Sequence, residues 1–565
     1  MKRQPSDLDP DLRPGDPGPA PRGSRSARRR RAWLAVALAG GLFAAACGSD
    51  GDSGSDPAGS SGSSSTEAPE VGADEVDADA TVRAAFSAPT RTLDPHTSDF
   101  PSDPLYNSPV FDRLTRMAPD GNSVEPMLAT EWTFVDDGKA LELKLRDDVT
   151  FHDGEAMDAA AVKASIERAK TLPGSTAAPK LASITAVEVV DDHTVRLVLD
   201  GSGGAELPVT LTGNAGVVMS PAAVASGRPL DQDPGDAGSG PYRVVDFKPN
   251  EQVVYERVDP YWDDSEIRAK RLEISFIADA AARINGVRAG QLDIAFIAGP
   301  QVANAVGMVD RGEIQGLLVT ARVANTIMLN TTRAPLDDVD IRRAVNFALD
   351  RAAISEGLYE GTCEPMLQPY EEGNWAHVEA IDELYPSDVE EARRLVEASG
   401  VADPGFELEV GAAGASQPLA EAAKEMLEQV GISVTVKPVP AIEVFPRFAA
   451  GESQAVVLGI VPGGDPNTIV ADFIVGGLKL ARGDDPGTRR VAELARAGVD
   501  PTLSQDERAE VYDELLTIVS EEAWYAPVCR AQYLFAHSDA LVGADSGMYG
   551  AWTGVPDFSN LGIRA

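Results

Sequence analysis

Histidine and cations are scarce in this 565-residue chain. It has five histidines, and no two of them lie within ten residues of each other, so a local histidine-rich metal motif is excluded. The 49 lysines and arginines are outnumbered by 89 aspartates and glutamates, giving a formal net charge of −40. Because nucleic-acid affinity depends on neutralising phosphates, this charge disfavours nucleic-acid binding. Hydrophobic residues make up 43% of the chain, which excludes a fully disordered protein.

The apolar run near the N-terminus is too short to cross a bilayer. It covers the fourteen residues 33–46 and follows four arginines at 28–31. A helix of that length spans about 21 Å, against roughly 30 Å of hydrocarbon. Residues 1–46 are therefore predicted to be a signal peptide. The arginines also fit a loose twin-arginine pattern, so the export route stays open.

A cysteine follows the predicted signal directly. The small residues that end in Cys47 resemble a bacterial lipobox, in which this cysteine is lipidated and becomes the first residue of the mature protein. Ala44 stands where that motif prefers leucine, and an ordinary A-x-A cleavage site is the alternative. The lipobox is favoured because residues 47–80, rich in serine, glycine and acidic residues, form a predicted disordered tether after the lipidated cysteine.

Cysteine is otherwise limited to Cys363 and Cys529. Two thiols in an exported protein favour one disulfide, which we expect between these residues. Two buried free thiols are the alternative.

Hydrophobic periodicity predicts a mixed α/β chain. Residues 130–145 and 184–199 alternate as hairpins, with a helix over 158–169 between them. In the second hairpin, Val187 and Val189 are expected to face the same way. Ser504 and Glu507 form the capping-box pattern that opens a helix. Further helices are predicted at 279–289, 339–349, 388–399 and 416–430, and further strands at 81–88, 242–247, 252–257, 272–277, 292–297 and 433–437.

Five blocks of sequence, in order, resemble family 5 of the bacterial extracellular solute-binding proteins, the oligopeptide, dipeptide and nickel class of ABC importer receptors. The strongest covers 110–168 and contains FHDGEAMDAAAVKASIER. TLDPH stands at 92–96. The others are 238–264 (GSGPYRVV…), 279–295 (DAAARINGVRAGQLDIA) and 334–354 (APLDDVDIRRAVNFALDRAAI).

The resemblance implies an α/β, two-lobed periplasmic-binding-protein-like fold (type II, cluster C) with an extra inserted domain and a hinge. Solute binds between the lobes, and closure buries it. The expected domains are lobe I at 81–112, 200–320 and 525–565, the inserted domain at 113–199, and lobe II at 321–524.

The resemblance also implies a function without catalysis. The expected protein is the substrate-binding component of an ABC importer, capturing a peptide or other small organic solute and delivering it to a membrane permease. It is expected to be a monomer without cofactor, metal site or catalytic residues, held by lipid on the outer face of the cell membrane. A solute-sensing lipoprotein that signals to a membrane partner is the main alternative, and a secreted hydrolase is a weaker one.

The ligand-anchoring motif departs from the family pattern. Peptide-binding members carry a WxxDY-like stretch whose aspartate holds the ligand's amino terminus. Here the stretch is LGIVPGGDPNT at 458–468, with Ile460 in place of the tryptophan. Asp465 is either a shifted cation anchor or a turn residue, and the turn is favoured. The altered motif therefore does not imply that the ligand is recognised by a free peptide amino terminus. Asn467, two positions after Asp465, is a further candidate for ligand binding.

Three other residues are candidates for the cleft. Tyr106 and Asn107 follow the first predicted strand. Trp375 could stack against a ligand, and a packed or interdomain tryptophan is the alternative reading of that residue.

Overall fold

The computed structural model describes residues 76–98, 103–119, 121–263, 269–412, 416–544, 548–549 and 555–565. The predicted signal peptide, Cys47 and the tether up to residue 75 lie outside these residues. Among the helices that are described, none has the length and hydropathy needed to cross a membrane.

One sheet of eleven strands runs through the described chain. Its two long central strands, β12 and β17, pair antiparallel, and their register breaks between Thr320 and Ala324. In order across the sheet the strands are β15 (Ser433–Val439), β14 (Gly405–Gly411), β16 (Ala455–Ile460), β12 (Gln315–Leu329), β17 (Tyr525–His537), β11 (Ile294–Ile297), β1 (Thr81–Phe86), β10 (Arg271–Phe276), β9 (Gln252–Arg257) and β8 (Tyr242–Lys248), and β13 (Cys363–Pro365) pairs with β17.

The two ends of the β12–β17 pair are hydrogen-bonded to strands in different halves of this sheet. The C-terminal half of β12, from Ala324, pairs with β16, whereas the C-terminal end of β17 pairs with β11. The register break at Thr320/Ala324 lies between these two halves. The domain boundaries given above stay predictions, and β17 itself begins at Tyr525 and contributes to both halves.

A separate four-stranded sheet is formed by β4 (Ala129–Val135), β5 (Ala140–Leu145), β7 (Thr194–Leu199) and β6 (Ile184–Asp191), in that order, and α2 (Ala159–Thr171) packs on it. Both predicted hairpins are confirmed. Val187 and Val189 face the same way, as expected, because they pair with Leu197 and Val195 without a register shift between them. Val187 is buried and Val189 is 45% exposed, so burial on this face decreases along the strand.

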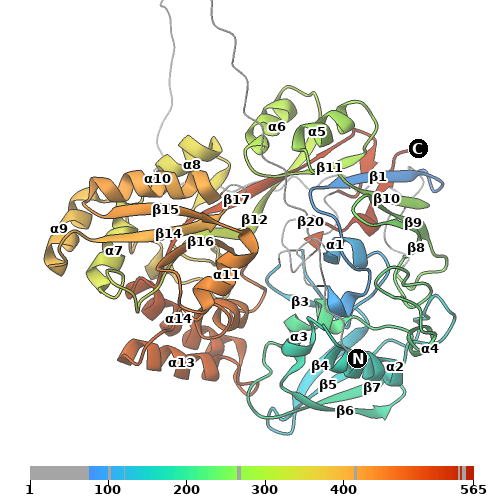
Figure 1. Ribbon diagram of the computed structural model, residues 1–565. Helices are drawn as coiled ribbons and strands as arrows, with labels where there is room; N and C mark the ends of the chain where they lie inside the picture. The colour runs from blue at the N-terminus through green and yellow to red at the C-terminus, as the bar shows by residue number, and fades with distance from the viewer. Residues whose placement is uncertain are drawn as a thin grey trace, which may run out of the picture. The chain divides into compact units, whose positions relative to one another are not determined.

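Helices cover the half of the main sheet that contains β14 and β15. α10 (Ser416–Gln429) packs on both strands, and α9 (Val389–Ser399) packs against α7 (Val339–Ala348) (Figure 1). Their apolar faces form one core, because leucine, valine and alanine recur at helical spacing. The remaining longer helices are α5 (Ala280–Arg288), α6 (Gln301–Asp310), α8 (Arg351–Tyr359), α11 (Ala441–Ala449), α13 (Pro486–Gly498) and α14 (Gln505–Glu521).

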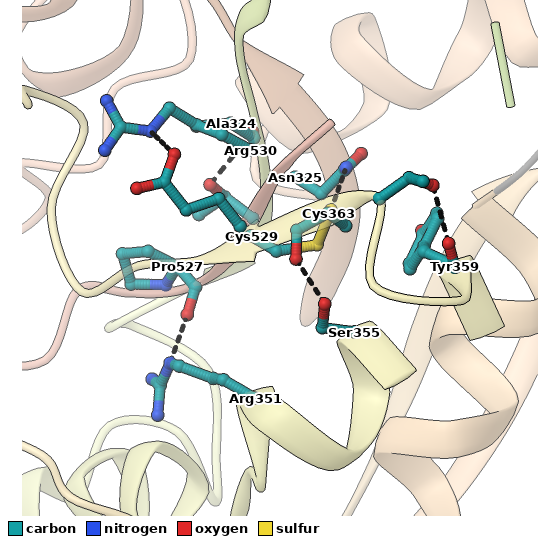
Figure 2. Close-up of a disulfide and its surroundings, with 12 residues drawn as sticks. Ala324, Asn325, Arg351, Ser355, Tyr359, Cys363, Pro527, Cys529 and Arg530 are labelled. Carbon is teal, nitrogen blue, oxygen red and sulfur yellow. Dashed lines mark hydrogen bonds and ion pairs between the residues drawn. A yellow bond between two sulfur atoms is a disulfide. The ribbon is translucent and has the colours of Figure 1, made fainter. Parts of the chain in front are cut away.

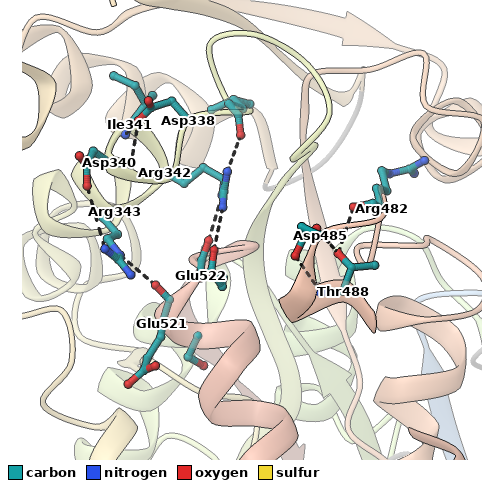
Figure 3. Close-up of polar contacts among 12 residues, drawn as sticks. Asp338, Asp340, Ile341, Arg342, Arg343, Arg482, Asp485, Thr488, Glu521 and Glu522 are labelled. Carbon is teal, nitrogen blue, oxygen red and sulfur yellow. Dashed lines mark hydrogen bonds and ion pairs between the residues drawn. The ribbon is translucent and has the colours of Figure 1, made fainter. Parts of the chain in front are cut away.

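Helix ends are fixed by side chains that the sequence identifies. Ser504 and Glu507 form the predicted capping box at the start of α14. The other end of α14 meets α7, where Arg342 donates to the backbone oxygen of Glu522 and to that of Leu336, both at 2.9 Å (Figure 3). Since Arg342 is buried, these bonds satisfy a guanidinium that would otherwise destabilise the core.

Cys363 and Cys529 form a disulfide between β13 and β17 (Figure 2). Both cysteines are fully buried. Ser355 of α8 donates to the backbone oxygen of Cys363 at 2.5 Å, and Arg351 donates to the backbone oxygen of Pro527 at 2.7 Å. The disulfide therefore lies in a packed region where α8, β13 and β17 meet.

Candidate ligand-binding site

Asp465 sits in the turn that follows β16. The strand ends at Ile460, and the chain enters α12 (Asn467–Ile469) and a π-helical turn at Val470–Ile474. The backbone N–H of Asn467 donates to Oδ1 of Asp465 at 2.9 Å, and that of Thr468 donates to the Asp465 carbonyl at 3.0 Å. Asp465 thus has the turn contacts expected of it, yet only 2% of its surface is exposed.

The buried carboxylate of Asp465 is paired with Arg508 of α14. Nη2 of Arg508 donates to both carboxylate oxygens, at 2.9 and 2.7 Å, and Nε donates to the backbone oxygen of Gly498 at 2.7 Å. The guanidinium also lies over the rings of Trp375 and Tyr512, 5.3 and 5.7 Å from their centroids. Arg508 is therefore held from several directions and is preorganised.

Burial and pairing act against each other in this ion pair. Burial raises the pKa of Asp465, and the charge of Arg508 only partly offsets that rise. For Arg508, burial lowers the pKa, but the charge and hydrogen bonds of Asp465 together with the effect of Tyr512 outweigh burial, so the pKa lies above its ordinary value. In this buried pair each charge is the other's counter-ion.

A cavity of about 330 Å³ opens beside this pair. That volume lies within the range of small-molecule sites. Its walls come from parts of the chain that are far apart in the sequence. Two are the segments 122–134 and 205–209, and the others are residue 375, residues 464–465 and the segment 501–508. The lining residues are Asn122, Ser123, Val124, Trp132, Phe134, Ala205, Pro208, Val209, Trp375, Gly464, Asp465, Pro501, Leu503, Gln505 and Arg508.

The wall of this cavity is aromatic and aliphatic. Trp132 and Phe134 come from β4. Trp375 precedes Asp465 by ninety residues in the sequence. Trp375 is fixed by its Nε1, which donates to the backbone oxygen of Gly464 at 3.4 Å, and by an edge-on contact with Tyr512 at 5.9 Å. It is partly buried, so it both packs against the protein and presents surface to the cavity.

A second carboxylate, that of Glu206, interacts electrostatically with the Asp465–Arg508 pair. Glu206 precedes the short helix α3 (Leu207–Thr210), and its Oε2 is buried and has no hydrogen-bond partner in the described part of the chain. Burial and the charge of Asp465 raise its pKa, while Arg508 lowers it. Glu206 does not itself line the cavity, although its neighbour Ala205 does.

Two of the five ligand candidates line this cavity, Trp375 and Asp465. Asn467 contacts Asp465 through its backbone but is not part of the lining. Tyr106 and Asn107 lie in α1 (Asp103–Asn107) and are not brought to it. The Tyr106 hydroxyl donates to the backbone oxygen of Ala88 at 2.8 Å, whereas both amide atoms of Asn107 are buried without a hydrogen-bond partner among the described residues.

Sequence reasoning missed Trp132, Phe134 and Arg508. Both aromatics lie in the hairpin predicted over residues 130–145, but alternation says only which residues share a face and not what covers that face. Arg508 stands one turn after the capping box at Ser504, which is a signal for the helix start and carries no information about a buried ion pair.

Metal binding finds no support in the part of the chain that the structure describes. No group of three or more histidine, cysteine, aspartate or glutamate side chains there could hold a metal ion. His377 contacts Asp382 at 2.9 Å and His152 contacts the backbone oxygen of Gly240 at 2.8 Å, and both contacts are structural.

Solved structures share this fold. The NikA protein of Brucella suis, in complex with Fe(III)-EDTA, superposes with a TM-score of 0.74 at 22% identity, covering 86% of this chain and 100% of the other. The ABC transporter substrate-binding protein CtaP of Listeria monocytogenes gives a TM-score of 0.75 at 18% identity, with the same coverage. The fold is thus the mixed α/β fold of two-lobed periplasmic binding proteins, as the sequence predicted.

The sequence match defines the family. Residues 123–476 match the bacterial extracellular solute-binding proteins, family 5, and the chain belongs to that family. Its members are solute-binding proteins and not enzymes. Heme-binding protein A of Haemophilus influenzae is 27% identical over 458 residues, 75% of this chain and 82% of that protein. Di/tripeptide-binding protein 3 of Pseudomonas aeruginosa is 24% identical over 455 residues, 75% of this chain and 84% of that protein.

Proposed function

We propose that this protein is the substrate-binding component of an ABC importer. It captures a peptide or other small organic solute in the cavity lined by Trp132, Phe134 and Trp375, and delivers the solute unchanged to a membrane permease. The observation that carries the proposal is this cavity, whose walls come from residues that are distant in the sequence. Such a cavity can be opened and closed by moving one wall relative to the other.

The proposed mechanism is differential binding between two states. A solute that contacts both walls stabilises the arrangement in which the walls are close, and it leaves the open arrangement unaffected. The permease then recognises the closed, loaded form. Relatives named for di- and tripeptides and for heme support the delivery of an organic solute.

The proposed location is outside the cytoplasm, on the outer face of the cell membrane. The predicted signal peptide exports the chain, and the predicted lipid on Cys47 anchors it there. The tether of residues 47–80 then gives the folded part freedom to meet the permease. A single folded chain contains the whole cavity, so a monomer suffices.

A thermal-shift screen with a broad panel of peptides, sugars and metabolites tests the function. A true ligand raises the melting temperature, because a solute that binds only the folded state stabilises by RT ln(1 + [L]/Kd), about 2.7 kcal/mol at a hundredfold excess over Kd. Trp132→Ala should reduce that shift at least severalfold. Phe445→Ala, at a partly exposed aromatic on α11 outside the cavity lining, is the control and should leave it unchanged. A panel in which no compound of any charge stabilises the protein contradicts the proposal.

A further inference from the structure

We infer that this cavity selects an electrically neutral solute with an apolar ring face, because Arg508 already occupies the carboxylate of Asp465. The inference rests on the proposed function and specifies its substrate class. It sets this protein apart from a receptor that recognises its ligand by a free amino terminus.

The charges that line the cavity are paired with each other. Among the fifteen lining residues only Asp465 and Arg508 are ionisable, and they contact each other at 2.7 Å. The two Asp465 oxygens already accept two N–H bonds from Arg508 and one from the backbone of Asn467. A ligand ammonium that enters here would lose its water, and the one carboxylate among the lining residues is already compensated by Arg508.

An anionic ligand fares no better in this cavity. Nε and Nη2 of Arg508 are engaged by Gly498 and Asp465, and the guanidinium face is covered by Trp375 and Tyr512. A ligand carboxylate drawn to Arg508 would lie near the carboxylate of Asp465 and would be repelled by it at short range. Glu206, which interacts electrostatically with the pair, adds negative potential when it is ionised and none when it is protonated.

The uncharged lining residues suit a ring with polar edges. Trp132, Phe134 and Trp375 offer flat apolar surface, which binds aryl rings by stacking and saccharide rings by their C–H faces. Asn122, Ser123 and Gln505 add neutral amide and hydroxyl groups at the wall. These groups match the hydroxyl or amide groups of an uncharged solute and need no ionic partner.

Three tryptophan derivatives and one sugar test the charge preference on the unaltered protein. N-acetyl-L-tryptophanamide is neutral, L-tryptophanamide is cationic at about pH 6, N-acetyl-L-tryptophan is anionic, and cellobiose is a neutral saccharide. Isothermal titration calorimetry should show that a neutral probe binds at least about tenfold more tightly than the two charged probes, a preference of about 1.4 kcal/mol.

The outcomes distinguish two classes of neutral solute, those with an aryl ring and those with a saccharide ring. Tighter binding of N-acetyl-L-tryptophanamide points to an aryl solute, and tighter binding of cellobiose points to a saccharide. Equal or tighter binding of a charged probe overturns the inference, and so does the absence of binding by all four probes. The proposed function is judged separately by the broad panel, which succeeds if any solute binds, charged or not.

Removing the guanidinium of Arg508 should reverse the preference for neutral over cationic probes. In Arg508→Leu the carboxylate of Asp465 is left without its guanidinium, so L-tryptophanamide should bind at least tenfold more tightly than to the wild type, and ethylguanidinium should raise the melting temperature of the variant alone. The double variant Asp465→Asn/Arg508→Leu should show neither response. An Arg508→Leu protein whose probe preference is unchanged overturns the inference.

Arg351→Leu is the matched control. Arg351 is also a buried guanidinium, but it donates to the side chain of Asn346 and to four backbone oxygens, those of Pro527, Asn346, Leu349 and Tyr385. Its removal should destabilise the fold without creating affinity for cations. If Arg508→Leu fails to fold, the four-probe series on the wild type decides the inference alone.

Discussion

Nδ2 of Asn374 donates a hydrogen bond of 2.7 Å to Oδ1 of Asn122, across 252 positions of sequence. Each of these asparagines adjoins the cavity, since Asn122 lines it and Asn374 precedes Trp375. A second bond has the same character, from the backbone N–H of Ala205 to the oxygen of Val499 at 3.2 Å. The walls of the cavity are therefore bonded directly to each other, and we expect solute entry to require these bonds to open.

Asn122→Ala should weaken solute binding without unfolding the protein. A neutral hydrogen bond contributes about 1 kcal/mol, so Kd should rise about threefold to tenfold. Isothermal titration calorimetry with a ligand from the thermal-shift screen measures the change. Asn214→Ala is the control, since the Asn214 amide bonds Thr176 and Ser98 and not the cavity wall. Equal losses of affinity in both variants would contradict a role in closure.

Replacing both Cys363 and Cys529 by serine should lower the free energy of unfolding. The two residues are 166 positions apart, and cross-linking a loop of that length restricts the unfolded chain by at most about 5 kcal/mol. Urea unfolding of the wild type with and without a reductant measures the loss, and the reductant should leave the serine variant unchanged. Mass spectrometry of non-reduced peptides checks the pairing, and free alkylation of both cysteines would refute it.

Local patterns in the sequence were enough to predict most regular elements. Hydrophobic periodicity and capping residues are defined by a few neighbouring positions. They predict the two hairpins, the helices α2, α9 and α10, and the capping box of α14. The long strands β12 and β17 were not predicted as single elements. The register break after Thr320 interrupts their pattern, and only their pairing with each other reveals their length.

The candidate site was predicted less completely than the fold. Asp465 could be found from its motif position and Trp375 as an aromatic residue able to stack against a ligand, but the role of Asp465 depends on Arg508, 43 residues later. A buried ion pair is set by tertiary packing, and neither residue carries a local mark of its partner. The same limit explains Trp132 and Phe134, whose strand was predicted but whose facing wall was not.

Cys47→Ala should release the protein from the membrane. The proposed anchor is a lipid on this cysteine, and the described part of the chain offers no membrane-spanning helix to replace it. Fractionation of cells that express the variant should find it in the soluble extracytoplasmic fraction, while Cys363→Ser/Cys529→Ser should stay with the membrane. A Cys47→Ala protein that remains associated with the membrane would contradict the proposal that a lipid on Cys47 is the anchor.

Glu409 of β14 should make stability depend on pH in the acid range. Its carboxylate is 1% exposed and accepts bonds from Arg447 at 2.9 and 3.1 Å and from Ser453 at 2.6 Å. Burial raises the pKa of Glu409, but these bonds and Lys437 outweigh burial and hold that pKa at about 2. Because the folded pKa lies below the unfolded value, the stabilisation is complete above about pH 5 and is lost as the pH falls towards about 2.

Glu409→Gln isolates this contribution from other carboxylates that titrate in the same range. The variant should be less stable than the wild type by at most about 3 kcal/mol at neutral pH, and the difference should shrink as the pH is lowered, because the protonated wild type resembles the amide. Urea unfolding at several pH values between about 7 and 3 measures it. Glu407→Gln, on the same strand but with an exposed side chain that accepts a bond from Lys437 at 2.9 Å, should change stability little at any of these values. A destabilisation by Glu409→Gln that is constant with pH would show that the carboxylate contributes by packing and not by its charge.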